Sequence, residues 1–425
     1  MKAICHSIAQ RMFFYSNLVH SLLAPDDYYN LQQASVMLTC HDDNRGYIFE
    51  GKKYSHLLDS INERLSLAGV DTVTVSMPFS SNGVTNFGRV FSVNRLIARA
   101  ILLDKFLKLF GIKLAPSDNK KVKAWALIVS RVKPQIVIGI QPPVELCIAA
   151  KSLGIPVYDL QHGVISGEGY YGAACRECFN QEGWPTCILC WNQASVTWIE
   201  SKIGHLTTSK LIGNPWFLRF IWPSKKDRLV SFAQEIINKI GSSNRKKILV
   251  TLQWGLDQCP NHHKTGMPVG LISCIKETSV SFDWWIRVHP VMLQGNRRAA
   301  TFSMLKKEFS SYENVYWEYC TDMPLPIVLA QTDLHITVSS ATTIEAGWFG
   351  IRTALLSADY KYLLNWFSEE LSSEIAEFVL PQCDAIRRWV ERCLLLSKEP
   401  VNTFMSTQPL DNFIKEIQVT CLRSP

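Results

Sequence analysis

Two adjacent serines stand between a short apolar stretch and a segment with helical spacing. The apolar residues end at Val338, the serines are Ser339 and Ser340, and Thr342 and Glu345 fall in the first turns of the helix expected next. Backbone N–H groups and the positive end of a helix dipole meet at such a junction, so it can bind a phosphate. The Glu345 carboxylate can accept hydrogen bonds from ribose hydroxyls. The alternative is a serine cap followed by a dipole-compatible glutamate.

A second candidate site lies in Arg287-Val-His289-Pro290, at the end of an apolar stretch. Doubly wound sheets bind ligands at the carboxyl ends of their strands, so Arg287 and His289 are expected at a ligand-binding edge. Pro290 ends the strand and keeps the preceding residue extended. His289 is therefore a candidate phosphate donor, with a purely structural histidine as the alternative.

A third motif, Gln161-His162-Gly163, follows another apolar stretch and opens a glycine-rich segment that contains Glu168. A histidine there can act as a base or contact a ligand. The glycines indicate close backbone approach or mobility. The alternative is a surface loop with an incidental histidine.

Four further residues complete the candidate set. Asp42 and Asp43 follow the first expected strand, so either could take a proton from an acceptor hydroxyl, or both could form a polar turn. Gln253 and Trp254 close a later strand and are expected near the donor, unless the indole simply packs between the two halves.

The elements that must position these residues alternate between strands and helices. Residues 135–140, 143–153 and 156–160 read as strand, helix and strand, which requires a parallel sheet with a right-handed crossover. Further strands are expected at 35–40, 71–76, 187–191, 209–212, 246–253, 283–290, 314–319, 333–340 and 352–357. Further helices are expected at 54–68, 93–111, 228–240, 343–350, 384–397 and 410–419.

This alternation predicts an α/β fold with two Rossmann-like domains that face a cleft, the arrangement called GT-B. The length of 425 residues suits two domains. We expect residues 1–222 to bind the acceptor, 223–245 to connect the halves, and 246–400 to bind the nucleotide-sugar. Residues 401–425 form a tail or helix that can pack back on the first domain.

Taken together, these motifs resemble bacterial surface-polysaccharide glycosyltransferases of GT-B architecture, which build capsule, O-antigen or other lipopolysaccharide chains. The motifs are Gln161-His162-Gly163, Gly213-Asn214-Pro215, His289-Pro290 and Ser339-Ser340. The His-Pro and Ser-Ser pairs are similar to those of transferases that use CMP-linked sialic acid or Kdo. The resemblance implies that His289, Ser339 and Ser340 bind the donor phosphate.

The expected activity is transfer of a sugar, with a CMP-sugar as the favoured donor, to a surface glycan or lipid-linked glycan. The base is expected among Asp42, Asp43, His162 and Glu168, with Gln161, Gly163 and Trp254 near the acceptor or cleft. No metal or other cofactor is needed if the helix dipole, histidine and serines neutralise the leaving phosphate. The alternatives are a polyol-phosphate transferase, a sugar-nucleotide 2-epimerase, or a non-catalytic protein that binds glycan or lipid carrier.

The positive charge is concentrated in one segment. The chain has 44 Lys and Arg against 37 Asp and Glu, a net charge of +7. Residues 95–133 hold ten Lys and Arg and two Asp, so this segment carries +8 and the remainder −1. Residues 93–111 place Arg95, Arg99, Lys105 and Lys108 among large apolar residues. Such a helix can lie on an anionic membrane, or be a core helix with solvated charges. No nucleic-acid motif accompanies the charge.

The 13 cysteines are too sparse for a disulfide scaffold, so most are expected to be reduced core residues of a cytoplasmic protein. A peripheral contact with the inner membrane is a further expectation, from the basic helix. No apolar run is long enough to span a bilayer. Two Cys-x-x-Cys pairs, Cys175/Cys178 and Cys187/Cys190, have the pairwise spacing of a zinc ribbon. Only eight residues separate the pairs, and the second pair lies in an expected strand, which points its cysteines to opposite faces.

Overall fold

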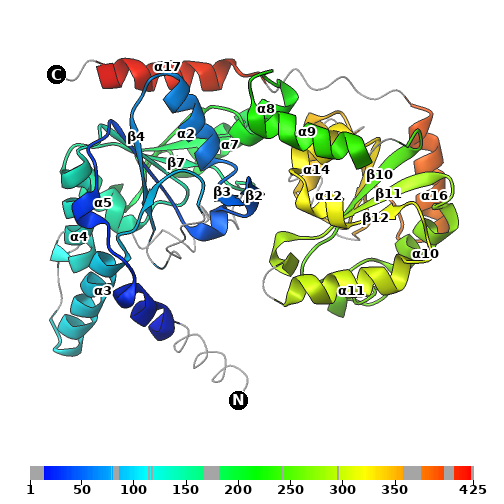
Figure 1. The fold of residues 1–425 in the computed structure, drawn as a ribbon, viewed down its shortest axis with the longest axis horizontal. Helices are drawn as coiled ribbons and strands as arrows, with labels where there is room; N and C mark the ends of the chain where they lie inside the picture. Colours follow the sequence, from blue (N-terminus) through cyan, green and yellow to red (C-terminus); the bar gives the residue numbers. More distant parts are fainter. Residues whose placement is uncertain are drawn as a thin grey trace. The chain divides into compact units, whose positions relative to one another are not determined.

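The computed structural model describes residues 14–77, 79, 86–112, 115, 118–165, 181–240, 243–293, 296–357, 375–396 and 406–422. The chain divides into two compact units (Figure 1). Unit 1 comprises Met1–Trp216 and Thr407–Pro425, and unit 2 comprises Phe217–Ser406. The boundary thus falls at residues 216/217, whereas the sequence pattern placed the connection within 223–245.

Unit 1 contains a parallel sheet whose order among the described residues is β5-β4-β1-β6-β7-β8-β9. The first strand lies inside the sheet; the chain adds two strands on one side of it, then returns to add four on the other. The strands are short and mostly buried, as expected for a parallel sheet covered on both faces. They are β1 (Val36–Cys40), β4 (Thr72–Ser76), β5 (Val90–Phe91), β6 (Ile136–Gly139), β7 (Val157–Leu160), β8 (Cys187–Cys190) and β9 (Thr208–Leu211).

Helices cover this sheet. They are residues 14–23, α2 (Leu58–Leu67), α3 (Asn94–Leu109), α4 (Lys120–Val132), α5 (Val144–Ser152) and α7 (Gln193–Ile203), with 3-10 turns η1 (Tyr28–Asn30), η2 (Asp42–Asn44) and η4 (Gln181–Gly183). Helix α4 begins where the Asn119 side chain accepts a hydrogen bond from the Lys121 amide at 2.9 Å, and its apolar face buries Trp125. A polar cap and a buried apolar face therefore fix helix α4 in unit 1.

A small antiparallel hairpin follows β1. It joins β2 (Tyr47–Phe49) to β3 (Lys52–Tyr54) through Glu50 and Gly51, which both have positive φ angles of 50° and 74°. Two such residues in succession form a turn whose twist suits a two-residue hairpin. Glycine takes this conformation at little cost, but glutamate seldom does, so the sequence carried only a weak hairpin signal.

The C-terminal helix α17 (Gln408–Leu422) belongs to unit 1. It buries Leu410, Phe413, Ile414 and Ile417. Its Gln418 side chain donates to the Ala68 carbonyl at 2.7 Å, just past α2. Unit 1 is therefore built from both ends of the chain.

Unit 2 contains a second parallel sheet, with the described order β12-β11-β10-β13-β14-β15. Its strands are β10 (Lys246–Thr251), β11 (Phe282–Arg287), β12 (Val315–Tyr316), β13 (Leu334–Thr337), β14 (Arg352–Leu355) and β15 (Ala376–Phe378). Around them lie α8 (Pro215–Ile221), which begins before the unit boundary, α9 (Arg228–Ile240), η5 (Leu256–Gln258), α10 (Val269–Thr278), η6 (Pro290–Leu293), α11 (Arg297–Phe309), α12 (Glu318–Asp322), α13 (Leu325–Ala330), α14 (Thr342–Trp348) and α16 (Cys383–Leu394).

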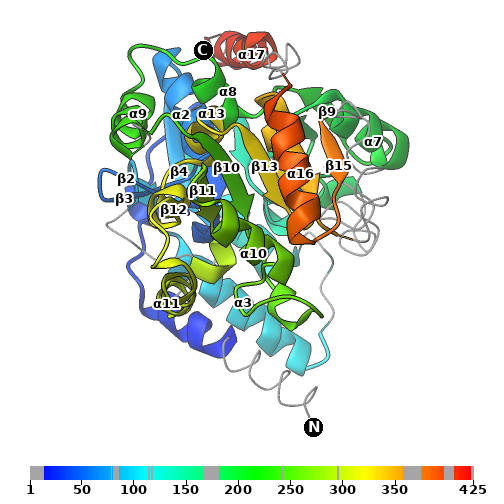
Figure 2. The same cartoon turned by 90° about the vertical axis from the view of Figure 1, so that its right-hand side faces the viewer.

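Tight packing joins α10 and α16 on one side of this sheet (Figure 2). Gly270 permits it, because a Cβ there would lie 2.3 Å from the Pro381 carbonyl oxygen. On the same helix, the Thr278 hydroxyl accepts a hydrogen bond from the indole N–H of buried Trp284 at 3.1 Å. The covering helices are thus held to the sheet by polar as well as apolar contacts.

The expected strand 314–319 is wrong in length. Only Val315–Tyr316 pair in the sheet, and α12 begins at Glu318. Helices α4, α7, α10, α11 and α13, the hairpin and strands β5 and β15 were not anticipated. Within the described residues, no helix is both long and apolar enough to cross a membrane.

Candidate functional site

Both sheets have a point where the strand order reverses, and there the carboxyl ends of the strands diverge. In unit 2 this point lies between β10 and β13, and in unit 1 between β1 and β6. Ligands of doubly wound sheets bind in the crevice outside this point. Gln253 follows β10 and Ser339 follows β13, while Asp42 follows β1. These sequence-predicted residues therefore lie at the sheet edges where doubly wound folds generally bind their ligands.

Gln253 and Ser339 join the two strands at the reversal in unit 2. The Gln253 Oε1 accepts the Ser339 backbone N–H at 2.6 Å, and its Nε2 donates to the Ser339 hydroxyl at 2.9 Å. A serine hydroxyl can also donate, and Oγ lies 3.3 Å from Oε1. Gln253 is therefore a positioning residue that fixes the turn after β13.

Ser340 is engaged in the first turn of α14. Its hydroxyl accepts from the Thr342 amide at 3.2 Å and lies 3.1 Å from the Thr342 hydroxyl. Its carbonyl accepts from the Thr343 amide and hydroxyl at 3.1 and 2.8 Å. Ser340 thus lies one residue before the N-cap, Ala341, and forms a local turn with Thr342, and α14 is only seven residues long. Any phosphate contact must come from the side-chain hydroxyls around this turn rather than from a long helix dipole.

Arg287 and Glu345 influence each other at the edge of the same crevice. Burial raises the pKa of Glu345 to about 7, while the Arg287 charge and a hydrogen bond from Thr342 oppose the rise. Burial likewise lowers the pKa of Arg287 to about 10. The Arg287 guanidinium donates to the carbonyls of Cys320 and Met323 at 2.6 and 2.7 Å. Arg287 therefore ties α12 to β11 through Nη1, and its expected contact with the donor stays a prediction.

His289 is half-buried just after β11. Its Nδ1 accepts the Val291 backbone N–H at 3.2 Å, so in the neutral ring Nε2 carries the proton. Burial lowers the pKa of His289, which favours this neutral form. The ring can therefore donate one hydrogen bond through Nε2. Pro290 is exposed and begins η6, whose turn supplies the Val291 amide.

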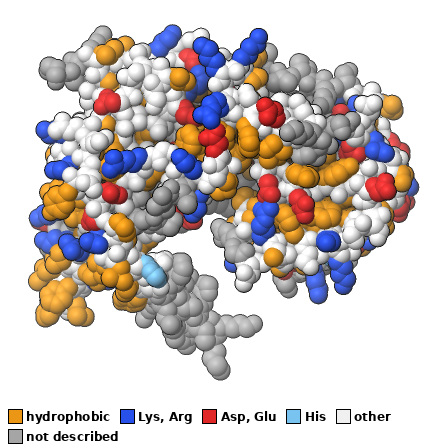
Figure 3. All heavy atoms as spheres, viewed as in Figure 1, with side chains coloured by type: hydrophobic (Ala, Val, Ile, Leu, Met, Phe, Trp, Pro, Cys, Tyr) orange, Lys and Arg blue, Asp and Glu red, His pale blue; other side chains and the backbone are white. Residues whose placement is uncertain are grey.

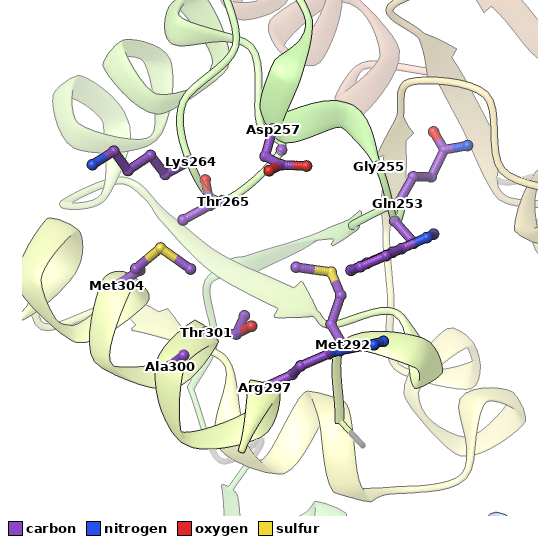
Figure 4. A pocket seen from close by; sticks show the side chains of 12 residues that line it. Gln253, Gly255, Asp257, Lys264, Thr265, Met292, Arg297, Ala300, Thr301 and Met304 are labelled. Carbon is purple, nitrogen blue, oxygen red and sulfur yellow. The ribbon is translucent and has the colours of Figure 1, made fainter. Parts of the chain in front are cut away.

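A pocket with a volume of about 180 Å³ opens beside Gln253 and η6 (Figure 4). Met292 and Met304 point toward one another across it, with Thr301 from α11 below and Thr265 above. Gln253 extends away from the hollow, in keeping with its bonds to Ser339. Of its walls, Gln253 and Trp254 were singled out from the sequence; the other walls were missed because they come from separate loops and α11.

Charged and aromatic groups also line this pocket. The Arg297 guanidinium lies 4.8 Å from the centre of the Trp254 ring, and the Trp254 side chain is 54% exposed. This is a cation–π distance. Lys264 and Asp257 complete the charged lining. The pocket thus offers an aromatic face and two cations.

One buried histidine in unit 2 was missed. His335 of β13 is fully buried, with Nε2 2.8 Å from the Thr251 hydroxyl and Nδ1 3.0 Å from the Thr353 hydroxyl. Burial lowers its pKa to about 3, so the ring is neutral. It links three neighbouring strands beneath the crevice and is structural rather than catalytic.

In unit 1, Gln161 has a positioning role. It is 2% exposed; its Nε2 donates to the Gly163 carbonyl and the Ser195 hydroxyl, and its Oε1 accepts the Trp191 amide at 2.7 Å. Gln161 is therefore engaged inside unit 1, and its expected place near the acceptor or cleft stays a prediction. Gly163 is exposed with open space where a Cβ would be, so no close approach requires glycine there.

His162 is half-buried beside a second histidine. Burial lowers the pKa of His162, while the Asp159 carboxylate and a backbone hydrogen bond at Leu160 act in the opposite direction. Burial, reinforced by His162, lowers the pKa of His56 to about 4. Asp159 is fully buried and accepts the Gln141 amide at 2.9 Å. His162 is therefore neutral near pH 7, with a carboxylate nearby that stabilises its protonated form.

Asp42 and Asp43 form the 3-10 turn η2. Asp43 is exposed, with its carboxylate 3.2 Å from His41 Nδ1, and Asp42 is partly exposed. Behind this turn, Arg45 and Asp59 form an ion pair at 2.9 Å, with side chains 1% and 2% exposed. The buried pair anchors the chain that leaves the turn. Asp59 gave no sequence signal, because it lies inside a helical pattern.

The remaining predicted residues divide as follows. Glu168, Cys175 and Cys178 lie outside the residues that the structure describes. Cys187 and Cys190 begin and end β8, and burial raises the pKa of both thiols. No group of three metal-ligating side chains occurs in the described part of the chain. In α3, Arg99, Lys105 and Lys108 are exposed, whereas Arg95 donates to the Leu22 and Ala24 carbonyls.

Comparisons with known proteins locate the fold. The sequence matches no protein-family model and no curated protein. Among solved structures, UDP-GlcNAc 2-epimerase from Methanocaldococcus jannaschii with UDP-GlcNAc and UDP is similar at a TM-score of 0.56 and 11% identity, over 91% of this chain and 100% of that one. The Neisseria meningitidis UDP-GlcNAc 2-epimerase bound to UDP-GlcNAc gives 0.55 and 12%, over 92% and 99%.

The wall teichoic acid polymerase TagF, as a histidine variant soaked with CDPG, is similar at a TM-score of 0.53 and 12% identity, over 93% of this chain and 92% of that one. At such low identities the likeness shows the fold. The predicted fold class is confirmed: the chain is an α/β protein with two Rossmann-like domains of GT-B type.

Proposed function

We propose that this protein is a glycosyltransferase that moves a sugar from a nucleotide-sugar to a bacterial surface glycan. The observation that carries the proposal is the grouping at the strand reversal of unit 2. There Gln253 fixes Ser339, and His289, which has a donor at Nε2, follows the neighbouring strand β11. Such donors suit the phosphate of a leaving nucleotide, whose charge grows as the glycosidic bond breaks.

We assign the donor sugar to the pocket beside Gln253. The exposed Trp254 ring offers a face for the C–H side of a sugar. Arg297 and Lys264 suit a negatively charged sugar, although Asp257 also lines the pocket. An acidic sugar favours a CMP-linked donor such as CMP-sialic acid or CMP-Kdo, in keeping with the His-Pro and Ser-Ser pairs.

We assign the acceptor and the base to unit 1. Among the candidate bases, His162 has the best support, because burial keeps it neutral near pH 7 and Asp159 stabilises the imidazolium formed when it accepts a proton. The acceptor is a glycan or lipid-linked glycan. Ser339, Ser340 and His289 would supply the phosphate contacts, and no step requires a metal.

A thermal-shift screen tests the proposal, since a ligand that binds the folded state raises the melting temperature. We expect CMP and CMP-sialic acid to stabilise the wild type, and His289→Ala to lose most of that shift. His205→Ala, an exposed histidine of unit 1, is the matched control. Stabilisation by UDP-GlcNAc with conversion to its 2-epimer would indicate an epimerase. CDP-glycerol with glycerol-phosphate transfer would indicate a polyol-phosphate transferase, and binding of glycan but no nucleotide would indicate a non-catalytic protein.

A further inference from the structure

The outer end of α3 exposes large apolar side chains. Phe106, Leu109 and Phe110 are 58%, 82% and 64% exposed, and Leu102, Leu103 and Ile112 are exposed as well. Single exposed apolar residues are ordinary, but a contiguous set on a soluble protein marks an interaction site. Figure 3 shows hydrophobic and basic side chains gathered over this end of unit 1, at the lower left.

The spacing puts most of these residues on one face. Leu102, Leu103, Phe106, Leu109 and Phe110 follow the i, i+3, i+4, i+7 pattern of a helix stripe. The buried residues Ile97, Ala98, Ala100 and Asp104 belong to the first two-thirds of the helix. In the last turns, side chains are exposed nearly all round, so this end projects beyond the packed part of the unit.

A second helix adds to the same region. In residues 14–23, Tyr15, Val19 and Leu23 are exposed at spacings of four. The Lys105 ammonium lies 3.7 Å from the centre of the Phe14 ring and 4.6 Å from that of Tyr15. Arg95 donates to the carbonyls of Leu22 and Ala24 at 3.1 and 2.8 Å. The two helices are therefore held together, and Arg95 is a structural residue rather than a surface charge.

The charge exposed on α3 is of one sign. Arg99, Lys105 and Lys108 are exposed, and the only acidic residue of the helix, Asp104, is buried. Asp104 accepts the backbone amides of Lys120 and Lys121 at the start of α4. The Asp104 carboxylate thus forms its hydrogen bonds inside unit 1. The exposed charged side chains of α3 are all basic, and they lie among apolar side chains.

We propose that this surface, formed by the outer end of α3 and helix 14–23, docks unit 1 on a lipid bilayer with anionic headgroups. A projecting helix with aromatic and leucine side chains can enter the interfacial region, while its lysines and arginine meet the lipid phosphates. Each basic side chain near such a surface adds to the attraction by anionic lipids, and salt screens this attraction. The proposal is independent of the proposed catalytic activity.

The structure also shows that several basic residues of the segment 95–133 already have partners within unit 1. Of the cations at 95–133, Lys121 pairs with Glu145, Lys123 pairs with Asp118 at 2.9 Å, and Arg131 donates to the Tyr29 carbonyl at 2.6 Å. These groups are engaged within unit 1. The membrane contact is therefore assigned to α3 and not to the whole basic segment.

Co-sedimentation of the full chain with vesicles tests this proposal. One set contains phosphatidylcholine alone, and the other contains phosphatidylcholine mixed with phosphatidylglycerol. We expect the wild type to bind the anionic vesicles more tightly. Phe106→Ser/Phe110→Ser should reduce the partition coefficient on anionic vesicles at least about tenfold, because two large apolar groups no longer enter the interface. Arg99→Ala/Lys108→Ala should reduce it about tenfold on anionic vesicles and little on neutral ones.

Matched controls come from exposed residues of unit 2. Val280→Ser/Leu395→Ser removes two large exposed apolar groups, and Lys225→Ala/Lys226→Ala removes two exposed charges. Both should bind like the wild type, and circular dichroism should show that every variant is folded. Failure of the wild type to bind, or equal loss in the controls, would overturn the proposal. A dimer in light scattering that Phe106→Ser/Phe110→Ser dissociates, without vesicle binding by the wild type, would instead identify a contact between two copies.

Discussion

The side chain of Gln253 holds Ser339 by two groups at once: Oε1 accepts the Ser339 amide at 2.6 Å, and Nε2 donates to its hydroxyl at 2.9 Å. These residues are 86 positions apart in the sequence. The contact joins the loops after β10 and β13, the strands between which the sheet order reverses. The geometry of the candidate phosphate site therefore depends on a glutamine that need not touch the phosphate.

Removing this glutamine should loosen the turn. Gln253→Ala leaves the Ser339 amide without its acceptor, and we expect a loss of about 1–3 kcal/mol in the free energy of unfolding. Ser339→Ala keeps the amide contact and should cost less. Urea-induced unfolding measures both, with Gln193→Ala, an exposed glutamine, as the control. Equal losses in all three variants would show that the contact does not stabilise the turn.

The pH dependence of transfer distinguishes the candidate bases. Because burial lowers the pKa of His162, its neutral form should dominate at pH 7, and kcat should fall as pH drops below the usual histidine range. His162→Gln should lower kcat by about 10²–10⁴ with a smaller change in KM. Asp42→Asn and Asp43→Asn should leave both nearly unchanged, as should the control His205→Ala. A large loss in either aspartate variant, with His162→Gln active, would move the base to η2.

Glu345 should make stability fall as pH rises. Its folded pKa is about 7 against an ordinary value of 4.5, so between these pH values the folded state binds more protons than the unfolded state. Stability is then lost as the pH rises through this window. Glu345→Gln cannot titrate. Between pH 5 and 8, the unfolding free energy of the wild type should fall by about 1–3 kcal/mol relative to that of Glu345→Gln. A pH-independent difference would show that Glu345 titrates normally.

The buried pair behind η2 should be sensitive to the loss of one partner. Asp59→Asn leaves the Arg45 charge buried without its counter-ion, and we expect a loss of about 3–5 kcal/mol in the free energy of unfolding. Arg45→Met/Asp59→Leu should lose less, because no charge is stranded. The exposed pair Arg298–Asp322 supplies the control: Asp322→Asn should cost at most about 1 kcal/mol. Similar losses of unfolding free energy in Asp59→Asn and Asp322→Asn would show that burial does not increase the cost of removing one partner of the pair.

Much of the architecture could be predicted because its signals are local. Strand 135–140, its helix and strand 156–160 are bounded by proline and glycine, and they appear as β6, α5 and β7. Their alternation with buried apolar strands predicts the parallel sheets. Helix α4 carried usable signals that were overlooked, since Asn119 is a favoured cap and Pro134 lies just past its end. Helix α11 was missed because no side chain caps its first turn. Strand 314–319 was too long because aromatic residues there favour both strand and buried helix.

The candidate site was only partly predictable for a similar reason. His289, Ser339 and Asp42 were found because each directly follows a strand, and strand ends can be read from the sequence. The roles of Arg287 and Gln161 could not be read in this way. Their partners are backbone carbonyls, amides or hydroxyls in other segments, which only the folded chain brings within reach. The charged Asp159 within an otherwise apolar strand was a usable signal for the surroundings of His162.

The position of α17 also bears on how the protein is made. Helix α17 follows the whole of unit 2 in the sequence and is therefore synthesised after it, yet it packs on the unit formed by the first half of the chain. Unit 1 must therefore wait, with the surface beside α2 uncovered, until all of unit 2 has been synthesised. Arg64 then gains Asp411, and Lys210 gains Glu416. Completion of unit 1 is thus coupled to synthesis of the segment that follows unit 2, which links the stability of unit 1 to an intact α17.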